Sequence, residues 1–315
     1  MTFRSAYAKR LADYIQLRQS LGYKMDTQTG VLRMFDTYVH VRQHRGPLSQ
    51  ALAVSFATAN PHVSRSECWR RYQFVRHFAE YMAGFDLHAP ILDPKALAMV
   101  RERSPVRIIS EKDLGRLLNA ARQISSRHPI LGIMLHAMIG LAASTGLRIG
   151  EIVRLDMSDV DLNERVLTVR QTKFKKDRLV PMHASMATVL RRYVVARDAA
   201  ILKHDPVPFF LSLRGLRCTR HTLEGALCTL GRKIGIRGVL GKGPNFHNLR
   251  HRFAVQRLVA WYRQGADVQA MLPFLATYMG HSDYTSTAYY LTTTPELMAV
   301  AAVRYHRSLL DGNRA

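Results

Sequence analysis

Apolar residues recur at helical spacing along almost the whole chain, and this periodicity restricts the fold to a mainly α-helical one. In the first hundred residues the pattern is broken at Gly22, Gly46-Pro47, Asn60-Pro61 and Gly84. Three or four helices packed as a bundle satisfy this arrangement. The exception to helical spacing is about residues 166–182, where two short β-type runs flank a polar turn and predict a small β-hairpin.

Prolines mark a boundary between two domains. Pro90, Pro94 and Pro105 bracket the charged string Arg101-Glu102-Arg103, and proline restrains one helix from continuing through the gap. The next helix is expected to begin at Ser110-Glu111-Lys112-Asp113, which resembles a capping box. We therefore predict a helical N-terminal domain over residues 1–97, a linker over 98–108, and a second domain over 109–315 that includes a C-terminal helix.

The chain is strongly basic. Its 46 Lys and Arg residues against 23 Asp and Glu give a formal net charge of +23. A protein with this excess attracts a polyanion such as DNA. An RNA-binding or ribosomal protein, or simply a well-solvated surface, carries similar charge. Charge therefore predicts the class of partner and no more.

Cysteine usage and hydropathy indicate the reducing cytoplasm. Cys68, Cys218 and Cys228 are odd in number and form no Cys-x-x-Cys pair, which argues against a structural zinc site. The start of the chain lacks the apolar stretch of a signal peptide. The longest apolar segment, about residues 130–143, contains His136 and is shorter than the ~20 residues of a membrane span. We expect no membrane partner.

Four short motifs between residues 145 and 290 carry groups that fit one reaction. They are Thr145-Gly146-Leu147-Arg148-Ile149-Gly150-Glu151, Lys173 in a basic turn, His247-Asn248-Leu249-Arg250-His251, and Gly280-His281-Ser282-Asp283 followed by Tyr290. Opening a phosphodiester covalently without a metal requires charge stabilisation at two phosphate oxygens, a proton for the leaving oxygen, and a nucleophile such as a phenol. Two arginines, a lysine, two histidines and a tyrosine meet these needs.

This set of motifs resembles the tyrosine recombinase, or phage integrase, family in order and spacing. The resemblance implies a site-specific DNA recombinase or integrase of a mobile element such as a transposon, with a helical domain that clamps DNA opposite a catalytic domain. It also implies cleavage without cofactors, through a 3'-phosphotyrosyl intermediate. The implied partners are double-stranded DNA and further copies of the chain in a tetrameric synapse, with accessory or sister recombinases as additional candidates.

The resemblance also assigns roles to single residues. The implied catalytic set is Arg148, Lys173, His247, Arg250, His281 and Tyr290, with Glu151 and His251 in support. Tyr290, nine residues after His281, attacks the phosphate, and Lys173 protonates the leaving 5' oxygen. The arginines and histidines stabilise the charged pentacoordinate state. Planar arginine suits two phosphate oxygens better than lysine does.

Several of these groups also fit ordinary structural roles. An Arg-Glu pair such as Arg148 and Glu151 is common at the start of a helix. A charge run in a turn, here Lys173 with Lys175 and Lys176, is often only solvated, although family members place DNA contacts there. Both interpretations are open from the residues alone.

Histidine and tyrosine spacing leaves further alternatives. His247 and His251 lie four residues apart on one helical face, as zinc ligands do, but a zincin has glutamate where this chain has Asn248. We therefore expect no metal. Tyr289 and Tyr290 point in different directions on a helix, so only one can face the arginines. The family's spacing of nine residues selects Tyr290.

Two helices carry predictions about partners. The last helix of the N-terminal domain interleaves basic and aromatic residues, so it either lies against a DNA groove or is a core helix with a basic outer face; the resemblance favours DNA contact. Its basic residues are Arg65, Arg70, Arg71 and Arg76. Thr294-Pro295-Glu296 predicts a final helix. The resemblance implies that this helix docks into a neighbouring protomer, and packing on its own domain is the alternative.

Two other functions stay open at this point. A type IB topoisomerase resembles the same chemistry but needs no synapse, so it would relax supercoiled DNA without recombinant products. A catalytically inactive DNA-binding regulator derived from an integrase is the second, and the full set of reactive residues argues against it.

Overall fold

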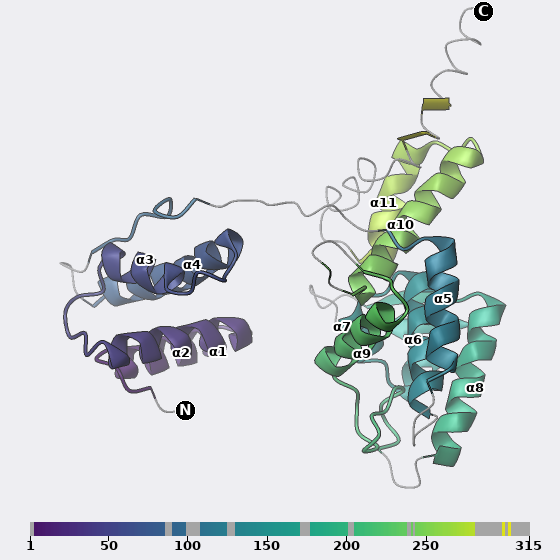
Figure 1. Ribbon diagram of the computed structural model, residues 1–315, viewed down its shortest axis with the longest axis horizontal. Helices are drawn as coiled ribbons and strands as arrows, with labels where there is room; N and C mark the ends of the chain where they lie inside the picture. The colour runs from purple at the N-terminus through teal and green to yellow at the C-terminus, as the bar shows by residue number, and fades with distance from the viewer. Residues whose placement is uncertain are drawn as a thin grey trace, which may run out of the picture. The chain divides into compact units, whose positions relative to one another are not determined.

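The chain divides into two compact units, Met1–Arg103 and Ser104–Ala315, which are described separately (Figure 1). The computed structural model describes residues 3–85, 90–98, 108–124, 130–170, 177–200, 205–237, 241, 243–280, 298–299 and 302–303. The described part is mainly helical with one small sheet, so the predicted fold class is confirmed. Among the described residues, no helix is long and apolar enough to cross a membrane.

Helices built around aromatic residues form the first unit. They are α1 (Ala8–Ser20), α2 (Asp26–Val41), α3 (Gln50–Thr58) and α4 (Arg65–Ala83). Serines cap two of them: the Ser49 hydroxyl accepts from the Leu52 amide and the Ser64 hydroxyl accepts from the Glu67 amide. Phe35 and Phe78 are fully buried in the centre. The predicted helical bundle is therefore present in this unit.

The second unit is built around one apolar helix. Its elements are α5 (Glu111–Arg122), α6 (Ile130–Thr145), α7 (Ile149–Ile152), η1 (Met157–Asp159), β1 (Val160–Asp161), β2 (Val166–Val169), β3 (Arg178–Pro181), α8 (Ala184–Ala200), α9 (Arg220–Lys233), α10 (Phe246–Arg263) and α11 (Val268–Met279). Helix α6 is apolar on all sides and packs against α5, α8 and α10. Ser110 caps α5 at the predicted position, its hydroxyl accepting from the Asp113 amide at 3.0 Å.

The sheet has the antiparallel order β1-β2-β3. Val166 pairs with Pro181 and Val169 pairs with Arg178, so the predicted strand pair over 166–182 is present. Alternation places Leu167 and Val169 in the core, and on β3 it buries Val180 while exposing Leu179. Arg178 therefore lies on the same face of β3 as buried Val180.

Of the tail, only Met298, Ala299, Ala302 and Val303 are described; they are helical and exposed. The predicted start of the last helix at 294–296 lies outside the described residues.

Candidate active site

A glycine turn brings Arg148 into the site. Gly146, just after α6, has φ of +65°, a left-handed conformation that glycine adopts without strain. A β-carbon there would lie 2.4 Å from Cδ1 of Phe253 on α10, so the turn also packs directly against that helix. Arg148 follows in extended conformation as the N-cap of α7. The turn therefore places Arg148 beside the helix that carries Arg250.

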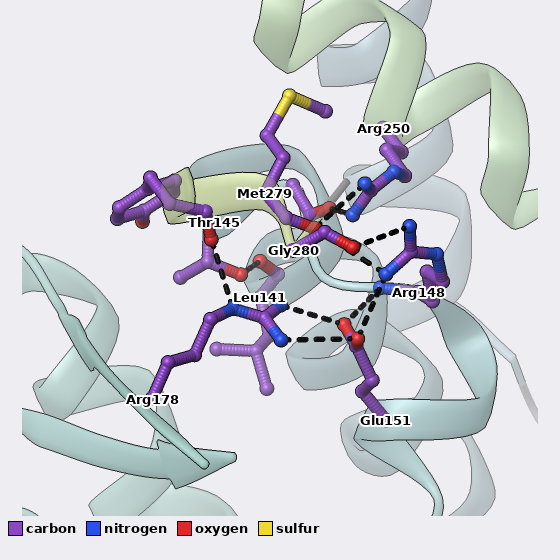
Figure 2. Close-up of polar contacts among 10 residues, drawn as sticks. Leu141, Thr145, Arg148, Glu151, Arg178, Arg250, Met279 and Gly280 are labelled. Carbon is purple, nitrogen blue, oxygen red and sulfur yellow. Dashed lines mark hydrogen bonds and ion pairs between the residues drawn. The ribbon is translucent and has the colours of Figure 1, made fainter. Parts of the chain in front are cut away.

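Glu151 is shared by two arginines. Its Oε1 accepts from Arg148 Nη1 at 3.1 Å and from Arg178 Nη1 at 3.2 Å, and its Oε2 accepts from Arg178 Nη2 at 2.9 Å (Figure 2). The Arg148 amide also donates to Oε2, at 2.9 Å. The Glu151 side chain is only 3% exposed. Burial raises the pKa of Glu151, but the hydrogen bond and charge of Arg178, followed by those of Arg148, outweigh it and hold this pKa below its ordinary value.

The backbone carbonyl groups at the end of α11 accept hydrogen bonds from three arginines. Arg178 Nε donates to the Tyr278 carbonyl at 2.8 Å. The Met279 carbonyl accepts from Arg250 Nη2 at 2.8 Å and from Arg148 Nη1 at 3.3 Å, and the Gly280 carbonyl accepts from Arg148 Nη2 at 3.0 Å (Figure 2). The C-terminus of a helix is the negative end of its dipole and attracts cations. Helix α11 therefore gathers the guanidinium groups at one point.

Arg148 and Arg250 differ in exposure. The Arg250 side chain is buried, and its Nη1 donates to the Gly146 carbonyl at 2.6 Å. The Arg148 side chain is 39% exposed. The two guanidinium groups share the Met279 carbonyl, so they lie next to each other, and Arg148 presents its charge to solvent. Such a pair is suited to bind an anion with more than one oxygen.

His247 lies in the same region, on the first turn of α10. The Asn245 side chain caps this helix by accepting from the Asn248 amide at 2.9 Å. The rings of His247 and His251 stand edge to face, with centroids 4.1 Å apart. Burial lowers the pKa of His247, and the positive charges of Arg250, Arg148 and Arg220 lower it further. Both effects favour the neutral form of His247.

The structure brings together five of the eight residues predicted for the catalytic and supporting set: Arg148, Glu151, His247, Arg250 and His251. The other three, Lys173, His281 and Tyr290, lie outside the described residues, as do Lys175 and Lys176. Among the described residues, no group of three or more His, Cys, Asp and Glu side chains is placed to hold a metal ion.

Arg178 is not among the site residues predicted from the sequence. A signal for it is present, because two-residue alternation along Arg178-Leu179-Val180 puts the arginine on the same face as a valine expected in the core. An arginine on the inward face of a strand needs a buried acceptor. That acceptor, Glu151, is distant in the sequence, so nothing near Arg178 identifies it.

The predicted DNA-binding arginines lie on the outer side of α4 in the first unit. Arg65 and Arg70 are exposed, and Arg71 and Arg76 are half-buried. Arg70 and Arg71 both pair with Glu67, and Arg76 pairs with Glu80. Tyr72 is fully buried and donates to the Asp93 carbonyl. Helix α4 is thus a core helix with a basic outer face, an arrangement compatible with DNA contact.

Residues 107–296, more than half of the chain, match the phage integrase family. This chain belongs to that family. The putative integrase/recombinase y4rE of Sinorhizobium fredii is 44% identical over 315 residues, covering 99% of this chain and 100% of y4rE. The tyrosine recombinase XerD of Ralstonia nicotianae is 31% identical over 222 residues, covering 70% of this chain and 67% of XerD.

Solved structures agree on the fold. The Tn1549 transposon integrase in complex with transposon right end DNA aligns with a TM-score of 0.68 and 17% identity, over 96% of this chain and 99% of that chain. The predicted family, fold and general activity, site-specific recombination by a tyrosine-type DNA strand transferase, are therefore confirmed. These relatives do not favour the topoisomerase or the inactive regulator.

Proposed function

We propose that this phage integrase family member cleaves and rejoins double-stranded DNA with Tyr290 as nucleophile and with Arg148, Arg250, His247 and His281 on the scissile phosphate. One observation supports this most: Arg148 and Arg250 both donate to the Met279 carbonyl, two residues before His281 in the sequence. These hydrogen bonds connect the two arginines proposed to bind phosphate to the end of α11, and in the sequence the segment that carries the proposed nucleophile follows α11.

The phenol oxygen of Tyr290 attacks phosphorus as its proton passes to His247 or to water. The bond from phosphorus to the 5' oxygen breaks, and Lys173 gives that oxygen a proton. The two guanidinium groups balance the negative charge that builds on the non-bridging oxygens. Neutral His247 can exchange a proton or a hydrogen bond with the reacting groups, since its pKa is lowered. The phosphotyrosyl link keeps the energy of the phosphodiester, so a 5' hydroxyl of a partner strand can reverse the step without metal or ATP.

The remaining parts have supporting roles in this proposal. Residues 1–97 form a helical DNA-binding domain that contacts DNA through the basic side of α4, residues 98–108 link the domains, and residues 109–315 form the catalytic domain. Lys175 and Lys176 add DNA contacts. The protein works in the cytoplasm as a homo-oligomer, four protomers joining two duplexes, and the last helix docks into a neighbouring protomer.

Trapping covalent protein–DNA complexes in cells tests the proposal and also finds the DNA site. Cells that express the chain are lysed in detergent, and DNA that stays attached to the protein is sequenced. We expect enrichment of a discrete site, with the protein on the 3' phosphate and a free 5' hydroxyl, and recombinant products from two copies of that site. Attachment to a 5' phosphate, no attached DNA, or relaxation without recombinants would contradict the proposal.

A further inference from the structure

Arg178 is a residue of the arginine site that the predicted catalytic set does not include. Its side chain is only 13% exposed. Both terminal nitrogens donate to Glu151 (Figure 2). Its Nε donates to the Tyr278 carbonyl. A single side chain on β3 therefore bridges the start of α7, which carries Arg148, and the end of α11, which binds Arg148 and Arg250 through its carbonyls.

The charges of these groups give Arg178 a specific effect. A carboxylate that faced Arg148 alone would form a neutral pair with it and weaken its attraction for a phosphate. Here two arginines share the Glu151 carboxylate. The Arg178 side chain donates to both oxygens, whereas the Arg148 side chain donates only to Oε1. The trio of Arg148, Arg178 and Glu151 keeps a net positive charge in a largely buried site.

We propose that Arg178 is a positioning residue for strand cleavage, which holds Glu151 and the end of α11 so that Arg148 faces the scissile phosphate with its charge available. The proposal rests on the phosphate-binding role proposed above for Arg148. Arg178 itself does not touch the reacting atoms. Its effect on the reaction passes through Glu151 and through the Tyr278 carbonyl.

Lysine cannot replace Arg178 fully. Its ammonium group is a point charge, whereas the planar guanidinium donates to both Glu151 oxygens and to the Tyr278 carbonyl at once. Arg178→Lys keeps the charge and loses part of the geometry, and Arg178→Gln loses both. The two variants therefore separate the contribution of charge from that of geometry.

The test compares full-length variants on the DNA site trapped in cells. Cleavage is measured in a single turnover at saturating protein, and affinity is measured separately by gel shift. Arg178→Gln is expected to slow cleavage about 10- to 100-fold, the range for losing a hydrogen-bonded charge, while DNA affinity changes by less than about threefold. Arg178→Lys is expected to recover part of the rate. If the glutamine variant does not fold, the lysine variant carries the same comparison.

Arg197 on α8 provides the matched control. It is also a buried arginine that pairs with a carboxylate, Asp198, and donates to a backbone carbonyl, that of Pro208, but it lies outside the site. Arg197→Gln is expected to lower the melting temperature without slowing cleavage below its own melting range. Equal slowing in Arg197→Gln and Arg178→Gln would overturn the proposal, because a general loss of packing would then explain both.

A double substitution tests the route through Glu151. In Glu151→Gln protein, loss of Arg178 is expected to slow cleavage by a smaller factor than it does in the parent. If the rate of the double variant falls by the product of the two single-variant factors, the proposal is overturned.

Carbon NMR of the Glu151 carboxyl gives a readout that does not depend on cleavage. Arg178→Gln should raise the Glu151 pKa, and an unchanged value would contradict the pairing. If the parent protein forms no covalent complex, the proposed function is wrong, but the NMR measurement still tests whether Arg178 pairs with Glu151.

Discussion

A β-carbon at Gly280 would lie 2.8 Å from Nη1 of Arg178, so the space that the Arg178 guanidinium needs exists only because residue 280 has no side chain. The same β-carbon would lie 3.5 Å from Nη1 of Arg148. Gly280 also ends α11 with φ of +65°, in the left-handed region. The glycine of the Gly280-His281 motif therefore serves both the turn and the arginine site.

Gly280→Ala is expected to destabilise the protein and to slow cleavage. The left-handed backbone costs an alanine about 1–2 kcal/mol, and displacement of Arg178 adds to this. Gly265→Ala is the control, since Gly265 has φ of +73° but open space around its β-carbon position. Melting temperatures and single-turnover rates are compared. Equal losses in the two variants would show that backbone strain alone acts.

Glu151→Gln is expected to lower the free energy of unfolding by about 3 kcal/mol at neutral pH, because it leaves the largely buried Arg178 guanidinium and the partly exposed Arg148 guanidinium without their carboxylate. The folded pKa of Glu151 is depressed, so its stabilisation is present above the ordinary value of about 4.3 and is lost as pH falls through the lower folded value. The difference between parent and variant should therefore shrink in acid. Urea unfolding at several pH values measures it, and a constant difference would contradict the assignment.

Arg220→Gln is expected to raise the pKa of His247, because the charge of Arg220 is one of the causes that lower it. As the pH falls, His247 becomes protonated, and cleavage that needs its neutral form stops. In the variant this loss should occur at a higher pH than in the parent, which should stay active below the ordinary histidine pKa of about 6.5. Arg232→Gln, near the other end of α9, is the control. Rates over a pH series, or histidine NMR, give the answer; the same shift in both variants would indicate a general charge effect.

Cleavage is expected to persist in excess EDTA, since the proposed mechanism uses side chains alone. Cleavage that chelation abolishes and magnesium restores would contradict the metal-free mechanism.

DNA affinity should fall steeply with salt, with a log-log slope of about 0.9 for each phosphate contact. Replacing exposed Arg65 with Gln should reduce that slope by about 1 if α4 contacts a phosphate through this residue. An unchanged salt slope would show that Arg65 does not contact a phosphate.

The sequence predicted what depends on local pattern. Helical spacing and the strand pair over 166–182 follow from the alternation of apolar residues, and Ser110 caps α5 as its sequence indicates. Gly146 lies in the first of the predicted motifs, but its contact with Phe253 joins positions 107 residues apart and has no local signal. The Arg178 contacts were missed for the same reason: Glu151 and Tyr278 become its acceptors only after β3, α7 and α11 have packed together.

The most direct test of the central proposal is formation of the covalent protein–DNA complex by two neighbouring tyrosine variants. On a nicked substrate that carries the trapped site, Tyr290→Phe is expected to bind DNA as the parent does and to form no complex that survives detergent. Tyr289→Phe is expected to form it. A complex that survives Tyr290→Phe and disappears with Tyr289→Phe would move the nucleophile by one residue, and a complex that survives both substitutions would contradict a nucleophile in this segment.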